Sequence, residues 1–356
     1  MIVILYALFT NYEDGVHPAT GNKEIKAMSE TDRIKSYYPL FMHVNLMVFV
    51  GYGFLSAFLK THSWTSVAYN LLIGAYALQI TILLQGLFHQ IFSSPEVGST
   101  AGGSTQAGGF QKISLSVDSL ILGDFGAAAV LVSFGAIVGK VSVFQLWIIA
   151  TFEVILYSLN EALCTNILKT VDMGGAMYVH VFGAYFGLAT SFFFRPGKAI
   201  KDLDGRGQGG YNSTMIALLG SVFLFVYWPS FNGALAPPSQ QLRIFINTIM
   251  AICASCITAC GICRLFHQRL TSKVIMNATL AGGVAIGSAS CIVATSSVSM
   301  CLGGAAGIIA ALGELSLKKI LEERINLHDT CGVHNLHGMP GILGGFAGGL
   351  AASLST

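Results

Sequence analysis

Two short segments, far apart in the chain, place an aspartate eight residues before a histidine. The first runs from Asp172 to His180, and the second runs from Asp329 to His337 and is followed by glycine. Imidazoles exchange protons near neutral pH and offer a donor and an acceptor to a small polar molecule. An aspartate at the start of a helix either caps backbone N–H groups or attracts a cation, and the sequence leaves both interpretations open.

The chain around these residues is too apolar for a water-soluble protein. Of its 356 residues, 53% are hydrophobic and 10% are Asp, Glu, Lys or Arg, against about 25% charged residues in soluble domains. A net charge of +2 argues against a nucleic-acid partner, and the high hydrophobicity argues against disorder. The composition predicts a polytopic protein of the lipid bilayer. Inside a bilayer each ionisable side chain is costly, so each of the four residues above needs a reason to be there.

The elements that position these residues are predicted to be membrane-spanning helices. A hydrocarbon core about 30 Å thick requires roughly 20 apolar residues of helix. With that length, the sequence predicts an all-α fold of ten full spans, and the first ten residues, MIVILYALFT, form a short helical stub or an interfacial segment. The predicted spans are 40–58, 66–92, 117–137, 143–165, 176–194, 213–231, 244–263, 275–295, 297–315 and 333–355.

Basic residues in the connections predict the orientation of these spans. Twelve Lys and Arg follow spans 1, 3, 5, 7 and 9, whereas the other side's short loops carry only Lys112, Lys169 and Arg243, so the first side is predicted to be cytoplasmic. Spans 1–5 and 6–10 then form two inverted repeats around a central pore, with a site near the membrane centre. The predicted parts are an N-terminal stub and extracellular loop at 1–39, a first half at 40–194, a cytoplasmic linker at 195–212 and a second half at 213–356.

The inverted arrangement predicts where the two segments meet. A two-fold axis in the membrane plane brings His180 and His337 together at the centre, and it leaves Asp172 near the outer mouth and Asp329 near the inner one. A role in a pathway across the membrane is one interpretation of the histidines. The other is a polar pair that joins two helices.

A run of cysteines does not predict a metal site. Cys253, Cys256, Cys260 and Cys263 lie on one predicted helix over about 15 Å. Four ligands on one rigid helix do not close a tetrahedron around zinc. We interpret the cysteines as packing residues and predict no metal, no cofactor and no catalytic residues.

Six segments together resemble the Rh branch of the ammonium transporter superfamily. They are YPLFMHVNLMVFVGYGFL (38–55), GDFGAAAVLVSFGA (123–136), DMGGAMYVHVFGAYFGL (172–188), YWPSFN (227–232), NATLAGGVAIG (277–287) and HDTCGVHNLHGMPGILGG (328–345). The resemblance implies a homotrimer, in the plasma membrane, with one narrow hydrophobic pore for ammonia or ammonium in each subunit. It also implies a complete N-terminal helix in place of the stub and a further helix after the last span.

The resemblance implies roles for single residues. The residues are the twin histidines His180 and His337, with His334 as second choice, the pore-mouth acids Asp172 and Asp329, the stacked gate of Phe125 and Phe231, and the outer-vestibule acid Glu161. A phenylalanine constriction and an apolar lumen exclude hydrated ions, because removing water from a full charge costs far more than removing it from neutral NH₃.

Three other functions are open. The same fold could conduct CO₂ or another small neutral molecule such as methylamine. A structural relative that conducts nothing is disfavoured, because both histidines are present. A membrane enzyme is disfavoured too, because no nucleophile or metal cluster lies beside them in the sequence.

Overall fold

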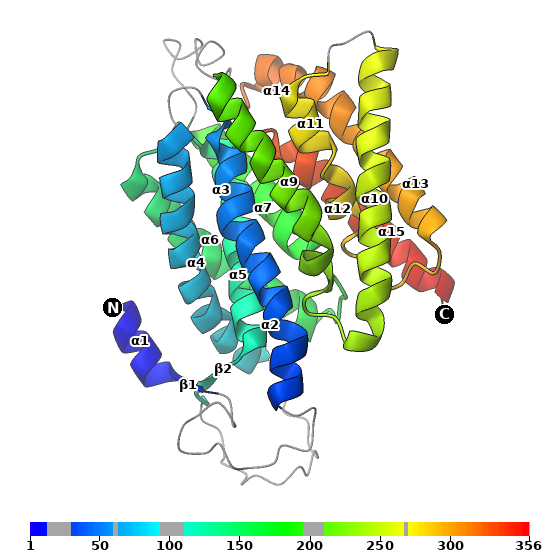
Figure 1. The fold of residues 1–356 in the computed structure, drawn as a ribbon. Coiled ribbons are helices and arrows are strands. Elements are labelled where there is room, and N and C mark those ends of the chain that lie inside the picture. The colour runs from blue at the N-terminus through cyan, green and yellow to red at the C-terminus, as the bar shows by residue number, and fades with distance from the viewer. Residues whose placement is uncertain (13–29, 60–62, 93–109, 195–209, 267–269, 356) are drawn as a thin grey trace.

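A computed structural model describes residues 1–12, 30–59, 63–92, 110–194, 210–266 and 270–355. In these residues long helices run side by side through the height of the molecule (Figure 1). Most of the predicted linker 195–212 and part of the predicted N-terminal loop lie outside the described residues.

The first half of the chain contains seven α-helices and two π-helical turns within these residues. They are α1 (Ile2–Phe9), α2 (Glu30–Leu46), a π-helical turn (Met47–Gly51), α3 (Tyr52–Leu55), α4 (Ser63–Phe92), α5 (Val117–Ile137), α6 (Val143–Asn166), a π-helical turn (Ala176–Val181) and α7 (Phe182–Phe193). Predicted span 1 is longer than expected, because α2 begins ten residues before Leu40 and continues through Pro39.

The second half also consists of α-helices and π-helical turns. It contains α9 (Tyr211–Gly233), α10 (Pro238–Leu265), α11 (Ser272–Ala278), α12 (Ala281–Ile286), α13 (Ser296–Leu312), a π-helical turn (Gly313–Leu317), α14 (Lys318–Ile325), a π-helical turn (His334–Gly338) and α15 (Met339–Ser355). The turn at His334 and α15 together cover the last predicted span.

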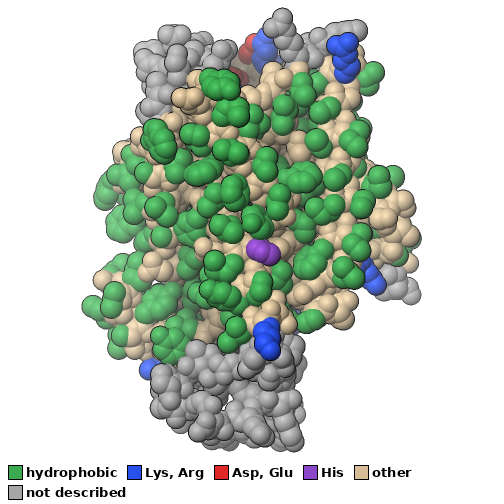
Figure 2. Space-filling view, viewed as in Figure 1, with side chains coloured by type: hydrophobic (Ala, Val, Ile, Leu, Met, Phe, Trp, Pro, Cys, Tyr) green, Lys and Arg blue, Asp and Glu red, His purple; other side chains and the backbone are tan. Residues whose placement is uncertain are grey.

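Eight helical segments in the described residues are long and apolar enough to cross a membrane. They coincide with predicted spans 1 to 7 and 9. Spans 8 and 10 are helical but are not among the eight, so the number ten stays a prediction. The surface agrees with a membrane-spanning fold. Figure 2 shows one face that is mostly covered by hydrophobic side chains, with Lys and Arg toward its ends.

The expectation of one continuous helix over 275–295 was wrong. The α-helix is interrupted between α11 and α12, and it ends at Ile286, after which the chain continues in turns. The second of these helices packs closely, because a Cβ on Gly282, within α12, would lie 2.4 Å from the carbonyl oxygen of Ala251. Beyond α12, the carbonyl of Gly287 accepts a hydrogen bond from the N–H of Gly174 at 3.2 Å, so this stretch contacts a loop of the first half.

The all-α prediction has one small exception. Strand β1 (Thr10–Tyr12) pairs in parallel with β2 (Ile113–Leu115), which comes just before α5. The pairing ties the segment after α1 to the start of α5. No alternating pattern in these three-residue strands distinguishes them from loop in the sequence.

The two halves share one buried core, and close helix packing within it depends on glycine. The clearest case is the contact of α10 with α13, where a Cβ on Gly303 would lie 2.1 Å from the carbonyl oxygen of Ala251. By contrast, a Cβ on Gly261, which lies on α10, would have no atom within 4 Å. Only the first of these two glycines is required by packing.

Candidate functional site

Asp172 caps the π-helical turn that carries His180. Its Oδ1 accepts a hydrogen bond from the N–H of Ala176 at 2.9 Å, and its Oδ2 accepts from the N–H groups of Met177 and Tyr178 at 2.8 and 2.9 Å. The hydroxyl of Ser288 donates to Oδ1 at 2.5 Å. A carboxylate has about four lone-pair sites, and here four donors occupy them.

Asp329 makes the same kind of cap before His337. Its Oδ1 accepts from the N–H groups of Gly332 and Val333, and its Oδ2 accepts from the N–H of His334, all at 2.9 Å. Both aspartates are buried. The hydrogen bonds account for both carboxylates by helix capping, which favours that interpretation over the attraction of a cation.

The structure brings His180 and His337 together, as the two-fold arrangement predicted. Their Nδ1 atoms lie 3.1 Å apart, and their rings stack with centroids at 5.0 Å and an interplanar angle of 12°. Both side chains are buried, with 0% and 2% exposure. Two nitrogens at this distance require one donor and one acceptor, so the rings hold complementary tautomers. The Nε2 atom of His180 has no hydrogen-bond partner among the described residues.

His334 lies one turn before His337 and does not join this pair. Its backbone N–H donates to Asp329, and its ring packs edge-on against Tyr185 at 5.8 Å. The structure therefore places His337, the first choice from the sequence, against His180.

Aromatic rings continue the stack on both sides of the histidines. Phe125 and Phe231 are stacked with centroids 4.5 Å apart, and Phe231 lies 5.7 Å from the ring of His180. The sequence analysis missed two further rings, Trp228 at 5.6 Å from His180 and Tyr52 at 6.1 Å from His337. A signal for Trp228 was available, because it lies three residues before Phe231 and so shares a helix face with it.

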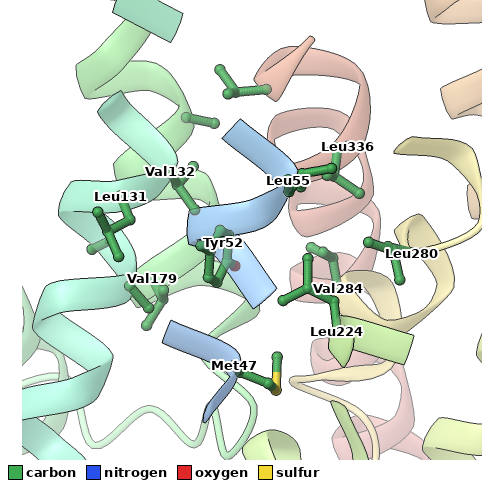
Figure 3. Close-up of a cluster of buried hydrophobic side chains, with 14 of the residues drawn as sticks. Met47, Tyr52, Leu55, Leu131, Val132, Val179, Leu224, Leu280, Val284 and Leu336 are labelled. Carbon is green, nitrogen blue, oxygen red and sulfur yellow. The ribbon is translucent and has the colours of Figure 1, made fainter. Parts of the chain in front are cut away.

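Apolar side chains from both halves surround the ring stack. Figure 3 shows Tyr52 among buried aliphatic side chains that converge from several separate segments. The labelled aliphatic residues are Met47, Leu55, Leu131, Val132, Val179, Leu224, Leu280, Val284 and Leu336. Tyr52 packs beside His337 and both histidines are buried, so a neutral molecule is favoured there over an ion.

The end of the site that carries Asp329 is tied to the end of α5. The ammonium group of Lys140 donates to the carbonyl of Ala136 at 2.8 Å, to the hydroxyl of Ser191 at 2.9 Å and to the carbonyl of His328. The N–H of Cys331 donates to the carbonyl of Gly135 at 3.0 Å. The segment that carries Asp329 is thus fixed to the first half of the chain.

Glu161, near the end of α6, lies in a second polar group that the sequence predicted only in part. Its Oε2 lies 2.7 Å from Nε2 of His89 on α4, and the side chain of Asn166 lies 2.9 Å from Nδ1 of the same histidine. Neither partner was expected, because the spacing of residues on different helices carries no signal of their contact. Within the described residues, no three potential metal ligands come together.

Two halves of apolar helices that meet at a buried stack of rings define a multi-pass membrane protein of the transport type. Comparison with known proteins agrees, since the model of the Ammonium Transporter Family matches residues 4–356. The chain belongs to this ammonium transporter family.

Individual relatives give the same result. The chain is 38% identical, over 99% of its length, to ammonium transporter Rh type C of Canis lupus familiaris, and the match covers 74% of that protein. It is 37% identical to ammonium transporter Rh type A of Bos taurus, over 99% of this chain and 80% of the relative.

Solved structures of relatives show the same fold. The Rh50 protein of Nitrosomonas europaea, of the Rhesus family of channels, matches with a TM-score of 0.79 at 32% identity, over 92% of this chain and 83% of that one. Mep2 of Saccharomyces cerevisiae has a TM-score of 0.71 at 18% identity, over 96% of this chain and 78% of its own. At that identity, Mep2 supports the fold alone.

Proposed function

We propose that the chain is an Rh-type channel that conducts ammonia across the membrane. The observation that carries the proposal is the buried pair of His180 and His337, whose Nδ1 atoms lie 3.1 Å apart beside the stacked rings of Phe125 and Phe231. The relatives named ammonium transporters of Rh types A and C support the choice of substrate.

The proposed mechanism separates the charge from the molecule that passes. Ammonium gathers at the outer end near Glu161 and gives its proton to water on that side of the membrane, and neutral NH₃ enters between the phenylalanines. Stripping water from NH₃ is far cheaper than stripping it from a full charge, so the apolar surroundings select the neutral form. The histidine nitrogens then replace the hydrogen bonds that NH₃ leaves in water.

Asp172 and Asp329 have a supporting role in this mechanism. Their caps hold the first turns of the two segments that carry the histidines, so they set where each imidazole lies. We further propose that the protein is a homotrimer of the plasma membrane and acts as a channel rather than an enzyme. His334 remains the second choice for the inner histidine of the pore.

The test is transport by the protein reconstituted in proteoliposomes. An inward NH₃ gradient makes the lumen alkaline and a CO₂ gradient makes it acidic, and stopped-flow fluorescence of a pH dye follows both. The variants are His180→Ala, His337→Ala and a matched control, His43→Ala, whose ring nitrogen lies 2.9 Å from the Ser230 hydroxyl, outside the ring stack. Size-exclusion chromatography with light scattering checks that each variant keeps the assembly of the wild type.

We expect fast alkalinisation from the wild type and His43→Ala, and a rate near that of empty liposomes from both pore variants. Wild-type rates from His180→Ala and His337→Ala would refute the assignment of the pore. Acidification by CO₂ without alkalinisation by NH₃ would assign the pore to CO₂ instead, and the absence of both fluxes would indicate a structural relative.

A further inference from the structure

Glu161 is held by side chains from two neighbouring helices. Its carboxylate lies 2.7 Å from Nε2 of His89, three residues before the end of α4. Nδ1 of His89 lies 2.9 Å from the side-chain nitrogen of Asn166, the last residue of α6. Glu161 is 6% exposed, so this arrangement replaces most of its contact with water.

The hydrogen bonds fix which nitrogen of His89 carries the proton. The side-chain nitrogen of Asn166 also donates to the carbonyl of Ala162 at 3.0 Å, and a carbonyl only accepts. The NH₂ end of the amide therefore faces the histidine, and an NH₂ group only donates. Nδ1 must then be the acceptor, so the proton of the neutral ring lies on Nε2 and is donated to Glu161.

The packing of α4 against α6 makes this geometry rigid. A second tie joins the same two helices about three turns away from Glu161, where the hydroxyls of Tyr76 and Thr151 lie 2.8 Å apart. With two such ties the helices cannot slide past each other without breaking both. His89 and Glu161 therefore keep their register.

We propose that His89 is a positioning residue for the outer ammonium site: its neutral ring orients the Glu161 carboxylate without cancelling its charge, and Asn166 selects the tautomer that does so. The inference rests on the proposed function, in which Glu161 gathers ammonium. A neutral donor leaves the charge of Glu161 available to a cation, whereas a cationic partner in the same place neutralises it.

The same geometry makes the site sensitive to pH. Protonation of His89 would make the His89–Glu161 pair neutral overall, so recruitment of the cation weakens as pH falls. Among the described residues, Asp118 and Lys112 line with His89 a cavity of about 380 Å³ at the outer end of α4 and α5.

Two substitutions separate orientation from charge. In His89→Gln the amide nitrogen donates to Glu161 and the amide oxygen accepts from Asn166, so both hydrogen bonds are kept in a group that does not titrate. In His89→Arg the bond to Glu161 is kept but a permanent positive charge is added. The 35% exposure of the His89 side chain leaves room for the longer group.

The measurement is uptake of radiolabelled methylammonium into proteoliposomes as a function of concentration and pH. For His89→Gln we expect KM within twofold of the wild type and a KM that no longer rises on acidification. For His89→Arg we expect KM to rise about tenfold while the maximal rate stays within about twofold, since neutralising a charge near a bound cation weakens binding on this scale. An unchanged KM in His89→Arg would overturn the proposal, because a purely structural contact tolerates an ion pair.

A second measurement tests the tautomer without transport. In protein with ¹⁵N-labelled histidine, the His89 signals are those missing from His89→Gln, and we expect a neutral ring with its proton on Nε2 at pH 7.5. Asn166→Asp replaces the donor by an acceptor, so the ring should become imidazolium. An imidazolium in the wild type would overturn the inference. If the wild type takes up no methylammonium and also gives no alkalinisation by NH₃, the proposed function is contradicted, and the NMR result remains the test of the tautomer.

Discussion

The hydrogen bonds of Asp172 predict a large loss of stability in Asp172→Asn. The carboxylate accepts four hydrogen bonds, three from backbone N–H groups and one from Ser288. An amide has one oxygen with two lone pairs, so two of the four donors lose their acceptor. Hydrogen bonds to a charged group contribute about 1.5–3 kcal/mol each, which gives a loss of about 3–6 kcal/mol in the free energy of unfolding.

Ser288 makes this prediction specific. Ser288→Ala in the wild-type background removes one charge-assisted bond and should cost about 1.5–3 kcal/mol. In the Asp172→Asn background, that bond is already weakened, so the same substitution should cost at least about 1 kcal/mol less. Asp329→Asn serves as the matched comparison. With three donors at Asp329, only one of them is lost, at about 1.5–3 kcal/mol.

The free energies are measured by steric trapping in bicelles, which gives equilibrium unfolding of a membrane protein without heating. Ammonia flux is measured on the same samples and divided by the amount of folded protein. We expect the flux per folded protein to fall far less than the folded fraction.

Two results would refute the capping argument. Equal costs of Ser288→Ala in the two backgrounds would show that the serine and the carboxylate are not coupled. A tenfold fall in flux per folded protein of Asp172→Asn, with the free energy of unfolding unchanged, would show that the carboxylate acts on the cation instead.

Three further predictions follow from the packing and the inner end of the site. Gly303→Ala should lower the free energy of unfolding by more than about 2 kcal/mol, because the backbone of α10 or α13 must move to make room for the methyl group. Gly261→Ala should be neutral or stabilising, and steric trapping compares the two variants. Phe231→Ala should cost about 3–5 kcal/mol and should raise proton leak in liposomes under a membrane potential; an unchanged leak contradicts its role as a gate. Lys140→Met should remove one of the two donors to the carbonyl of His328, the other being the Ser191 hydroxyl. The loss of this charge-assisted bond should cost about 1.5–3 kcal/mol and speed hydrogen exchange in the segment before His334, measured by mass spectrometry.

Helices were predictable because the bilayer sets one length and one composition for them. Span 3 was predicted with both of its ends, 117–137, and α5 covers the same residues. The interruption of span 8 was not predicted, because glycines are compatible both with an apolar helix and with a break in one. The break lies at Thr279 and Leu280, and local hydropathy does not distinguish two short apolar helices from one long one.

In the site, too, some residues were predictable from the sequence and others were not. His180 and His337 were paired in advance because the inverted repeat relates their positions, so one symmetry argument was sufficient. Tyr52 and His89 were missed because no symmetry or spacing relates them to the histidines or to Glu161. Their contacts arise only once separate helices pack.

The two halves use one local device to position the two histidines. In each half an aspartate caps a π-helical turn that begins four or five residues later, Ala176–Val181 after Asp172 and His334–Gly338 after Asp329. A π-helical turn holds one more residue than an α-helical turn and is frequent at functional sites. It rotates the side chains on either side of it relative to each other, so an imidazole can face the centre while the helix that follows keeps its apolar face toward its neighbours. Because each cap holds the start of its own turn, the two caps stabilise the segments that carry the histidines, and the loss of either cap should lower the stability of the fold more than the flux of the molecules that still fold.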